Sequence, residues 1–91
     1  MQKSLKSPEY ARLIAMLVAV RKKAEIRQQV LAKKLGKPQS FVAKYEGGER
    51  RIDAVEFIAI ARALEADPVR LFRESVAGEP QVKSTRKSAA K

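Results

Sequence analysis

The chain has 91 residues, which is enough for one compact domain with short tails but not for a second core. It contains no cysteine and no histidine, and this excludes a disulfide framework, a thiolate metal site and a histidine general base. Twenty basic and ten acidic residues give a formal net charge of +10, so we expect a polyanionic partner, either nucleic acid or an acidic membrane surface.

The position of the charge favours nucleic acid. Residues 21–51 hold ten basic and three acidic residues, whereas residues 52–76 hold three basic and five acidic ones. No stretch reaches the roughly 20 apolar residues of a membrane span. The N-terminal sequence MQKSLKSPEYAR also lacks the apolar segment of a secretory signal. We therefore expect a cytoplasmic protein with no membrane contact.

The first predicted helix covers residues 8–24, after a flexible arm at residues 1–7. Ser7, Pro8 and Glu9 are typical of a helix start, because they supply a cap, a fixed φ and a favourable charge. Apolar residues then follow at helical spacing: Tyr10, Leu13, Ile14, Leu17 and Val20. The basic run at residues 21–23 is expected to be a solvated helix end rather than a phosphate site.

Two short helices follow, over Gln28–Leu35 and Gln39–Tyr45. Gly36 is expected to end the first of them in a left-handed conformation, and a Lys-Pro pair makes the turn. Two further glycines, at 47 and 48, end the second helix. The inward residues predicted from the helical period are Leu31, Ala32, Leu35, Val42 and Tyr45.

Two more helices complete the predicted domain, which spans residues 8–76. Asp53 and Glu56 form a capping box ahead of a helix at residues 54–64. Asp67 and the proline after it start a last helix that continues to about residue 76. Residues 77–91 are basic and poor in large apolar side chains, so we expect a disordered tail. The predicted fold class is an all-α, five-helix bundle.

The string IRQQVLAKKLGKPQSFVAKYEGGERR resembles the lambda-repressor-like, or Xre/Cro-type, helix-turn-helix family, and the resemblance covers about residues 13–72. It implies a transcription regulator, with repression as the expected sign, that binds double-stranded DNA and is associated with the nucleoid. The matching positions are Gln28, Leu31-Ala32, Leu35-Gly36, Gln39-Ser40, Val42, Tyr45-Glu46-Gly47 and Arg50-Arg51. The departures are Glu25 and Glu65 in place of glycine, and Arg27 and Pro38 at the usual helix caps.

Four residues are predicted to read DNA bases, because the helical period turns them away from the core: Gln39, Ser40, Ala43 and Lys44. The resemblance places Gln39 and Ser40 nearest the base edges, where a glutamine amide can pair with adenine. Lys44 can reach a guanine or a phosphate. Phe41 has two interpretations, packing on the preceding helix or touching a thymine methyl group.

A second group is predicted to bind phosphates, which adds affinity but no sequence information. The resemblance assigns Gln28 to this role at the start of its helix. Lys37, Arg50 and Arg51 are expected to flank the groove. Glu46 is expected to brace the joint between the third and fourth helices through backbone hydrogen bonds, since phosphate would repel it.

The expected assembly is a homodimer on a pseudo-palindromic operator, with half-sites about 34 Å apart. Val69, Leu71 and Phe72 are candidates for the dimer contact. Two alternatives stay open: an antitoxin that also holds a small protein partner, and a protein-interaction adaptor without specific DNA binding. We expect no enzyme, no cofactor and no metal site, because both aspartates cap helices and no catalytic group of residues is evident.

Overall fold

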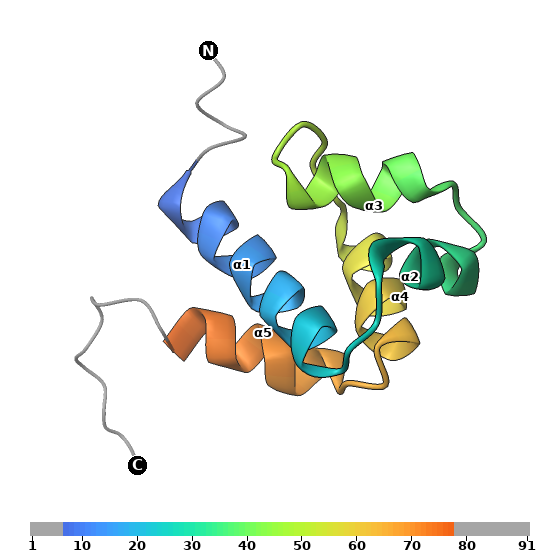
Figure 1. Ribbon diagram of the computed structural model, residues 1–91. Coiled ribbons are helices and arrows are strands. Elements are labelled where there is room, and N and C mark those ends of the chain that lie inside the picture. Colours follow the sequence, from blue (N-terminus) through green and yellow to red (C-terminus); the bar gives the residue numbers. More distant parts are fainter. Residues whose placement is uncertain (1–6, 78–91) are drawn as a thin grey trace, which may run out of the picture.

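The computed structural model describes residues 7–77, and these residues form five helices and no strand. The bounds are α1 Pro8–Lys23, α2 Gln28–Leu35, α3 Gln39–Glu46, α4 Ala54–Ala63 and α5 Pro68–Ala77 (Figure 1). The predicted all-α, five-helix bundle is confirmed, and each helix begins where the sequence places it. The predictions for residues 1–6 and 78–91 lie outside the described residues, and Ala77 belongs to α5 rather than to a tail.

Three of the helices begin with a side chain that accepts a backbone hydrogen bond, as their sequences predict. The capping residues are Ser7 for α1, Asp53 for α4 and Asp67 for α5. At α4 the capping box is complete, because Glu56 also accepts the N–H of Asp53 at 2.9 Å. These caps satisfy N–H groups that the first turn of a helix leaves without partners.

Helices α1 to α4 all end in the same motif, in which a residue with positive φ turns the chain away from the helix. The four residues are Glu25, Gly36, Gly48 and Glu65, with φ between 61° and 84°. In α1 the N–H of Ile26 donates to the carbonyl of Arg21 at 3.1 Å, which is the long hydrogen bond of a Schellman motif. The four helices thus share one ending, although two of the positive-φ positions hold glutamate and two hold glycine.

Replacing Glu25 or Glu65 with glycine is expected to raise the free energy of unfolding by about 1 kcal/mol each. Both glutamates hold a left-handed backbone that costs a residue with a Cβ about 1–2 kcal/mol, and the greater freedom of unfolded glycine offsets part of the gain. Urea denaturation followed by circular dichroism measures the change. The matched control is Lys23→Gly at the last residue of α1, where the backbone is helical, and this variant is expected to be less stable than the wild type. A loss of stability in both glutamate variants would contradict the strain.

The core lies where all five helices meet. Helix α2 packs against α3 and α4, while α5 packs across α1 and α4. Figure 1 shows α3 along one edge of the molecule, with α4 behind α2 and α5 below α1. The side chains with no exposure are Leu17, Leu31, Val42, Tyr45, Ile60 and Ala61. Within residues 7–77, no helix is long and apolar enough to cross a membrane.

Candidate nucleic-acid interface

The turn between α2 and α3 sets the relative position of the two helices. Gly36 takes a left-handed conformation, and the N–H of Lys37 donates to the carbonyl of Ala32 at 2.9 Å. Pro38 is extended and leads directly into α3. Ala32 is almost fully buried, and its small side chain allows α2 and α3 to approach closely. The left-handed Gly36 and the small, buried Ala32 thus have the roles in the helix-turn-helix that the sequence predicts.

Helix α3 has one buried face and one exposed face. Its buried residues are Phe41, Val42 and Tyr45. Burial raises the pKa of the Tyr45 phenol, and the neighbouring Glu46 carboxylate raises it further, so the hydroxyl stays neutral. The four predicted base-reading residues, Gln39, Ser40, Ala43 and Lys44, are all exposed. The exposed face presents an amide, a hydroxyl, a methyl group and an ammonium group to solvent.

Phe41 packs inside the protein and is only 9% exposed. Its ring meets Tyr45 edge to face, with 5.7 Å between the centroids. Two cations lie over the ring: the Nζ of Lys37 at 5.4 Å from its centroid and the Arg50 guanidinium at 4.8 Å. Of the two interpretations of Phe41, the packing one describes its place in the structure.

A buried ion pair joins α1 to the end of α3. The guanidinium of Arg21 binds the Glu46 carboxylate through two hydrogen bonds, of 2.7 and 3.0 Å, and donates a third to the carbonyl of Ile26 at 2.7 Å. Both side chains are at most 10% exposed. The prediction that Arg21 is part of a solvated helix end is therefore wrong. Arg21 follows Leu17 by four residues, so it continues the buried stripe of α1, and that spacing was visible in the sequence.

Glu46 also contacts the start of α2. Its Oε1 atom accepts a hydrogen bond of 2.8 Å from the Nε2 of Gln28. The prediction that Glu46 braces the joint between α3 and α4 through backbone hydrogen bonds is wrong, because its carboxylate joins α3 to α1 and α2. A carboxylate can only accept, so the amide of Gln28 turns its nitrogen toward Glu46 and keeps one N–H and its oxygen for another partner.

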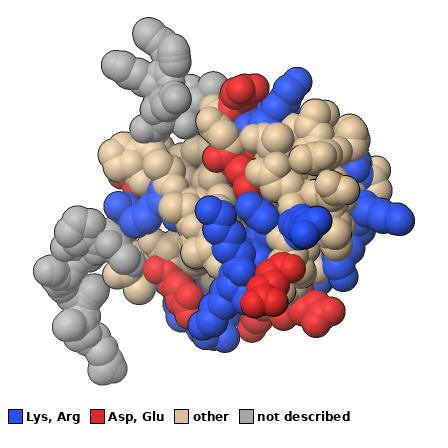
Figure 2. Space-filling model, in the orientation of Figure 1, with Lys and Arg blue, Asp and Glu red and all other residues tan. Residues whose placement is uncertain are grey.

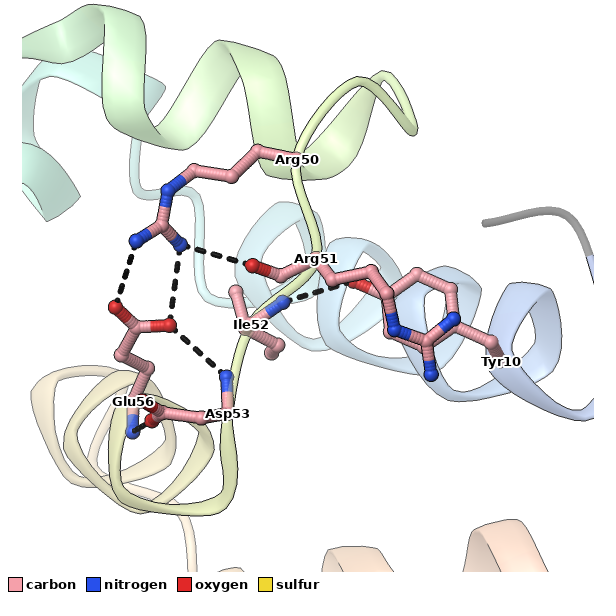
Figure 3. Close-up of polar contacts among 6 residues, drawn as sticks. All are labelled: Tyr10, Arg50, Arg51, Ile52, Asp53 and Glu56. Atoms are coloured by element: carbon pink, nitrogen blue, oxygen red, sulfur yellow. Dashed lines mark hydrogen bonds and ion pairs between the residues drawn. The ribbon is translucent and has the colours of Figure 1, made fainter. Parts of the chain in front are cut away.

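Arg50 lies in the loop between α3 and α4 and is held by protein groups (Figure 3). It binds the Glu56 carboxylate through two hydrogen bonds, of 3.1 and 3.0 Å, and donates to the carbonyl of Arg51 at 2.9 Å. Hydrogen bonding with Glu56 raises the pKa of Arg50, and the same contact lowers the pKa of Glu56. The sequence analysis identified Glu56 only as a capping residue and missed its ion pair.

Arg51 points the other way from the same loop, toward α1 (Figure 3). Its guanidinium lies over the ring of Tyr10, 4.2 Å from the centroid. The hydroxyl of Tyr10 accepts the N–H of Ile52 at 3.1 Å, which ties the loop to the start of α1. Arg51 is exposed, so its stacked side chain remains accessible from solvent.

The starts of α2 and α3 differ from those of the other helices. Neither Arg27 nor Pro38 caps its helix with a side-chain hydrogen bond. The third N–H of each helix is used, since Val30 donates to the carbonyl of Arg27 and Phe41 to that of Pro38. The first two N–H groups of each helix are the ones that could bind an anion, which the helix dipole also favours. Arg27 and Lys37 stand close to these two helix starts in the sequence. Figure 2 shows Lys and Arg side chains over the side of the molecule that carries the turn between α2 and α3.

The predicted site residues belong to α3, to the start of α2, to the turn between these two helices and to the loop that follows α3 (Figure 1). The helix-turn-helix family model matches residues 17–71. A solved structure described as an Xre-family-like protein from Pseudomonas syringae pv. tomato str. DC3000 is similar, with 40% identity and a TM-score of 0.79. The alignment covers 86% of this chain and 95% of that one. No curated protein matches. The chain thus belongs to the Xre/Cro-type helix-turn-helix family of DNA-binding transcription regulators.

Proposed function

We propose that this protein is a sequence-specific repressor of transcription that lays α3 in the major groove of double-stranded DNA. The observation that carries the proposal is the exposed face of α3, which presents Gln39, Ser40, Ala43 and Lys44 to solvent. None of the large hydrophobic side chains exposed within residues 7–77 belongs to this helix. Gln39 offers an amide for adenine, and Lys44 offers a cation for guanine. Ala43 lies between them, and its small side chain would allow α3 to approach the bases closely.

The phosphate contacts proposed here are Gln28, Lys37 and Arg51. Gln28 stands at the uncapped start of α2, where its remaining N–H and the backbone N–H groups favour an anion. Lys37 and Arg51 are exposed cations that precede and follow α3 in the chain. Neutralising phosphates releases counterions, so we expect affinity for any duplex to fall steeply as salt rises.

The dimer contact that we propose is an apolar face formed by α4 and α5. Five of the six large hydrophobic residues exposed within residues 7–77 belong to these two helices: Val55, Ile58, Val69, Phe72 and Val76. A groove of about 500 Å³ is lined by three of them, Ile58, Val69 and Phe72, and by further apolar side chains, with Arg51 also in its lining. An exposed apolar face of this kind is typical of an interface. Leu71, which was expected at the dimer contact together with Val69 and Phe72, is buried in the core instead.

The charges at this groove support a second copy of the chain as its occupant. Asp53 and Arg62 both line the groove, at opposite ends of α4. A two-fold axis near Ile58 would run α4 antiparallel to its copy and bring each Arg62 close to the partner's Asp53. The face is therefore complementary to itself in charge. A dimer bound at a promoter would block access of the polymerase, which is why we propose repression. A protein bound to chromosomal DNA would also be associated with the nucleoid.

Selection of bound sites from a random duplex pool tests this proposal. The wild-type protein is expected to enrich an inverted repeat with half-site centres about 34 Å apart. Phe72→Glu, which places a charge on the apolar face, is expected to be monomeric by analytical ultracentrifugation and to bind the repeat at least tenfold more weakly. Val30→Glu, at an exposed apolar position on α2, is the control for the dimer and should sediment like the wild type. A pool with no enriched sequence would reject specific DNA binding, whereas an enriched single half-site would reject only the dimer.

A further inference from the structure

The charge of Arg50 is balanced within the protein by the Glu56 carboxylate. Its guanidinium binds both oxygens of Glu56 and the carbonyl of Arg51, and one of its faces lies over the ring of Phe41. Three of its five N–H groups are used in these contacts. A phosphate approaching the same guanidinium would come close to the Glu56 carboxylate, which would repel it.

These contacts connect two helices that matter for the position of α3. Phe41 belongs to the buried face of α3, two residues after Gln39. Glu56 belongs to the capping box of α4. Its Oε1 atom accepts one hydrogen bond from Arg50 and another from the N–H of Asp53. Arg50 therefore joins the Phe41 ring on α3 to the first turn of α4. Figure 3 shows its contact with Glu56 on α4.

We propose that Arg50 and Glu56 form a positioning clamp that holds α3 at its angle to α4, and that Arg50 does not bind phosphate. The inference rests on the proposed DNA-binding function and gives Arg50 a different role from Arg51 next to it. Losing the clamp tilts or loosens α3, which harms base reading much more than the general attraction to phosphates. Because Arg50 contacts no phosphate in this arrangement, its loss leaves the number of released counterions almost unchanged.

Binding of four variants to the enriched site and to a random duplex, each over a range of salt concentrations, separates the two roles. Arg50→Ala is expected to weaken the enriched site about tenfold and the random duplex less than twofold, with the wild-type salt slope. Arg51→Ala, the matched control, is expected to weaken both DNAs alike and to lower the slope by about 0.9, the contribution of one phosphate. Arg50→Lys is expected to behave like Arg50→Ala, because an ammonium group cannot bind a carboxylate in bidentate fashion while stacking on a ring.

The fourth variant, Glu56→Gln, tests whether Arg50 acts through its partner. Glutamine keeps a carbonyl oxygen for the Asp53 N–H but loses the charge that holds Arg50. Adding Arg50→Ala to Glu56→Gln should cause little further loss on the enriched site, since the clamp is already open. Thermal melts would show that the variants are folded at the temperature of the assay.

Two results would overturn the clamp while leaving the proposed function intact. One is an Arg50→Ala variant that loses both DNAs equally with a slope reduced by about 0.9. The other is restoration of binding by Arg50→Lys, which a simple phosphate contact allows. A wild-type protein with no measurable affinity for either duplex would instead reject the proposed function, and the role of Arg50 in DNA binding with it.

Discussion

Replacing Arg21 with alanine is expected to lower the free energy of unfolding by about 3–5 kcal/mol. The substitution leaves the Glu46 carboxylate buried without its cation, and its side chain is only 7% exposed. The carbonyl of Ile26 also loses its hydrogen bond from the guanidinium. For a domain of this size, 1 kcal/mol shifts the melting temperature by roughly 4–8 °C, so the loss should exceed about 12 °C. Urea and thermal denaturation followed by circular dichroism measure both quantities.

An exposed ion pair in the same chain provides the control for this prediction. Arg70 and Glu74 lie one turn apart on α5, and their side chains are 71% and 53% exposed. Arg70→Ala removes an ion pair with a hydrogen bond of 3.1 Å and is expected to change stability by no more than about 0.5 kcal/mol, because solvent screens the charges. Equal effects of the two substitutions would mean that burial does not strengthen the Arg21–Glu46 pair.

Replacing Gln39 or Lys44 with alanine is expected to weaken binding to the enriched site by about tenfold or more. Each contact with a base edge contributes about 1–3 kcal/mol of discrimination, and a random duplex offers few matching bases. Affinity for the random duplex should therefore change less than threefold for Gln39→Ala. Fluorescence anisotropy with the two labelled duplexes, at one fixed salt concentration, measures both affinities.

The control for base reading is a residue that we assign to phosphate. Arg51→Ala should lower the affinity for both duplexes by the same factor, since phosphates are present on every sequence. Both alanine variants on α3 replace exposed side chains, so their melting temperatures should stay close to that of the wild type. Equal losses on the two duplexes for Gln39→Ala and Lys44→Ala would contradict their assignment as readers.

Local signals predicted the helices well, because caps, prolines and helical spacing act within a few residues of one another. Ser7-Pro8, Asp53 with Glu56, and Asp67 with the proline after it each mark a helix start in the sequence and in the structure. The exposed face of α3 was predictable for the same reason: the inward positions of Val42 and Tyr45 determine which neighbours point outward.

The partners of the charged residues were not predictable from the same signals. Arg21 and Glu46 are 25 positions apart, and only the packing of α1 against α3 brings their side chains together. The sequence places Arg21 on the buried stripe of α1, but nothing within a few residues of it indicates that Glu46 is its partner. The interpretation of Glu46 as a brace for the next joint was wrong for this reason.

The sequence by itself determined the five helices, the turn at Gly36 and the family, because these depend on local backbone preferences and on the spacing of apolar residues. The tertiary structure decided what the basic residues do. It buried Arg21 in an ion pair, balanced Arg50 with Glu56, and left Lys44 and Arg51 accessible to solvent. The physical reason is that the interaction energy of a charged group depends on its burial and on the groups around it, and the packing of the helices determines both.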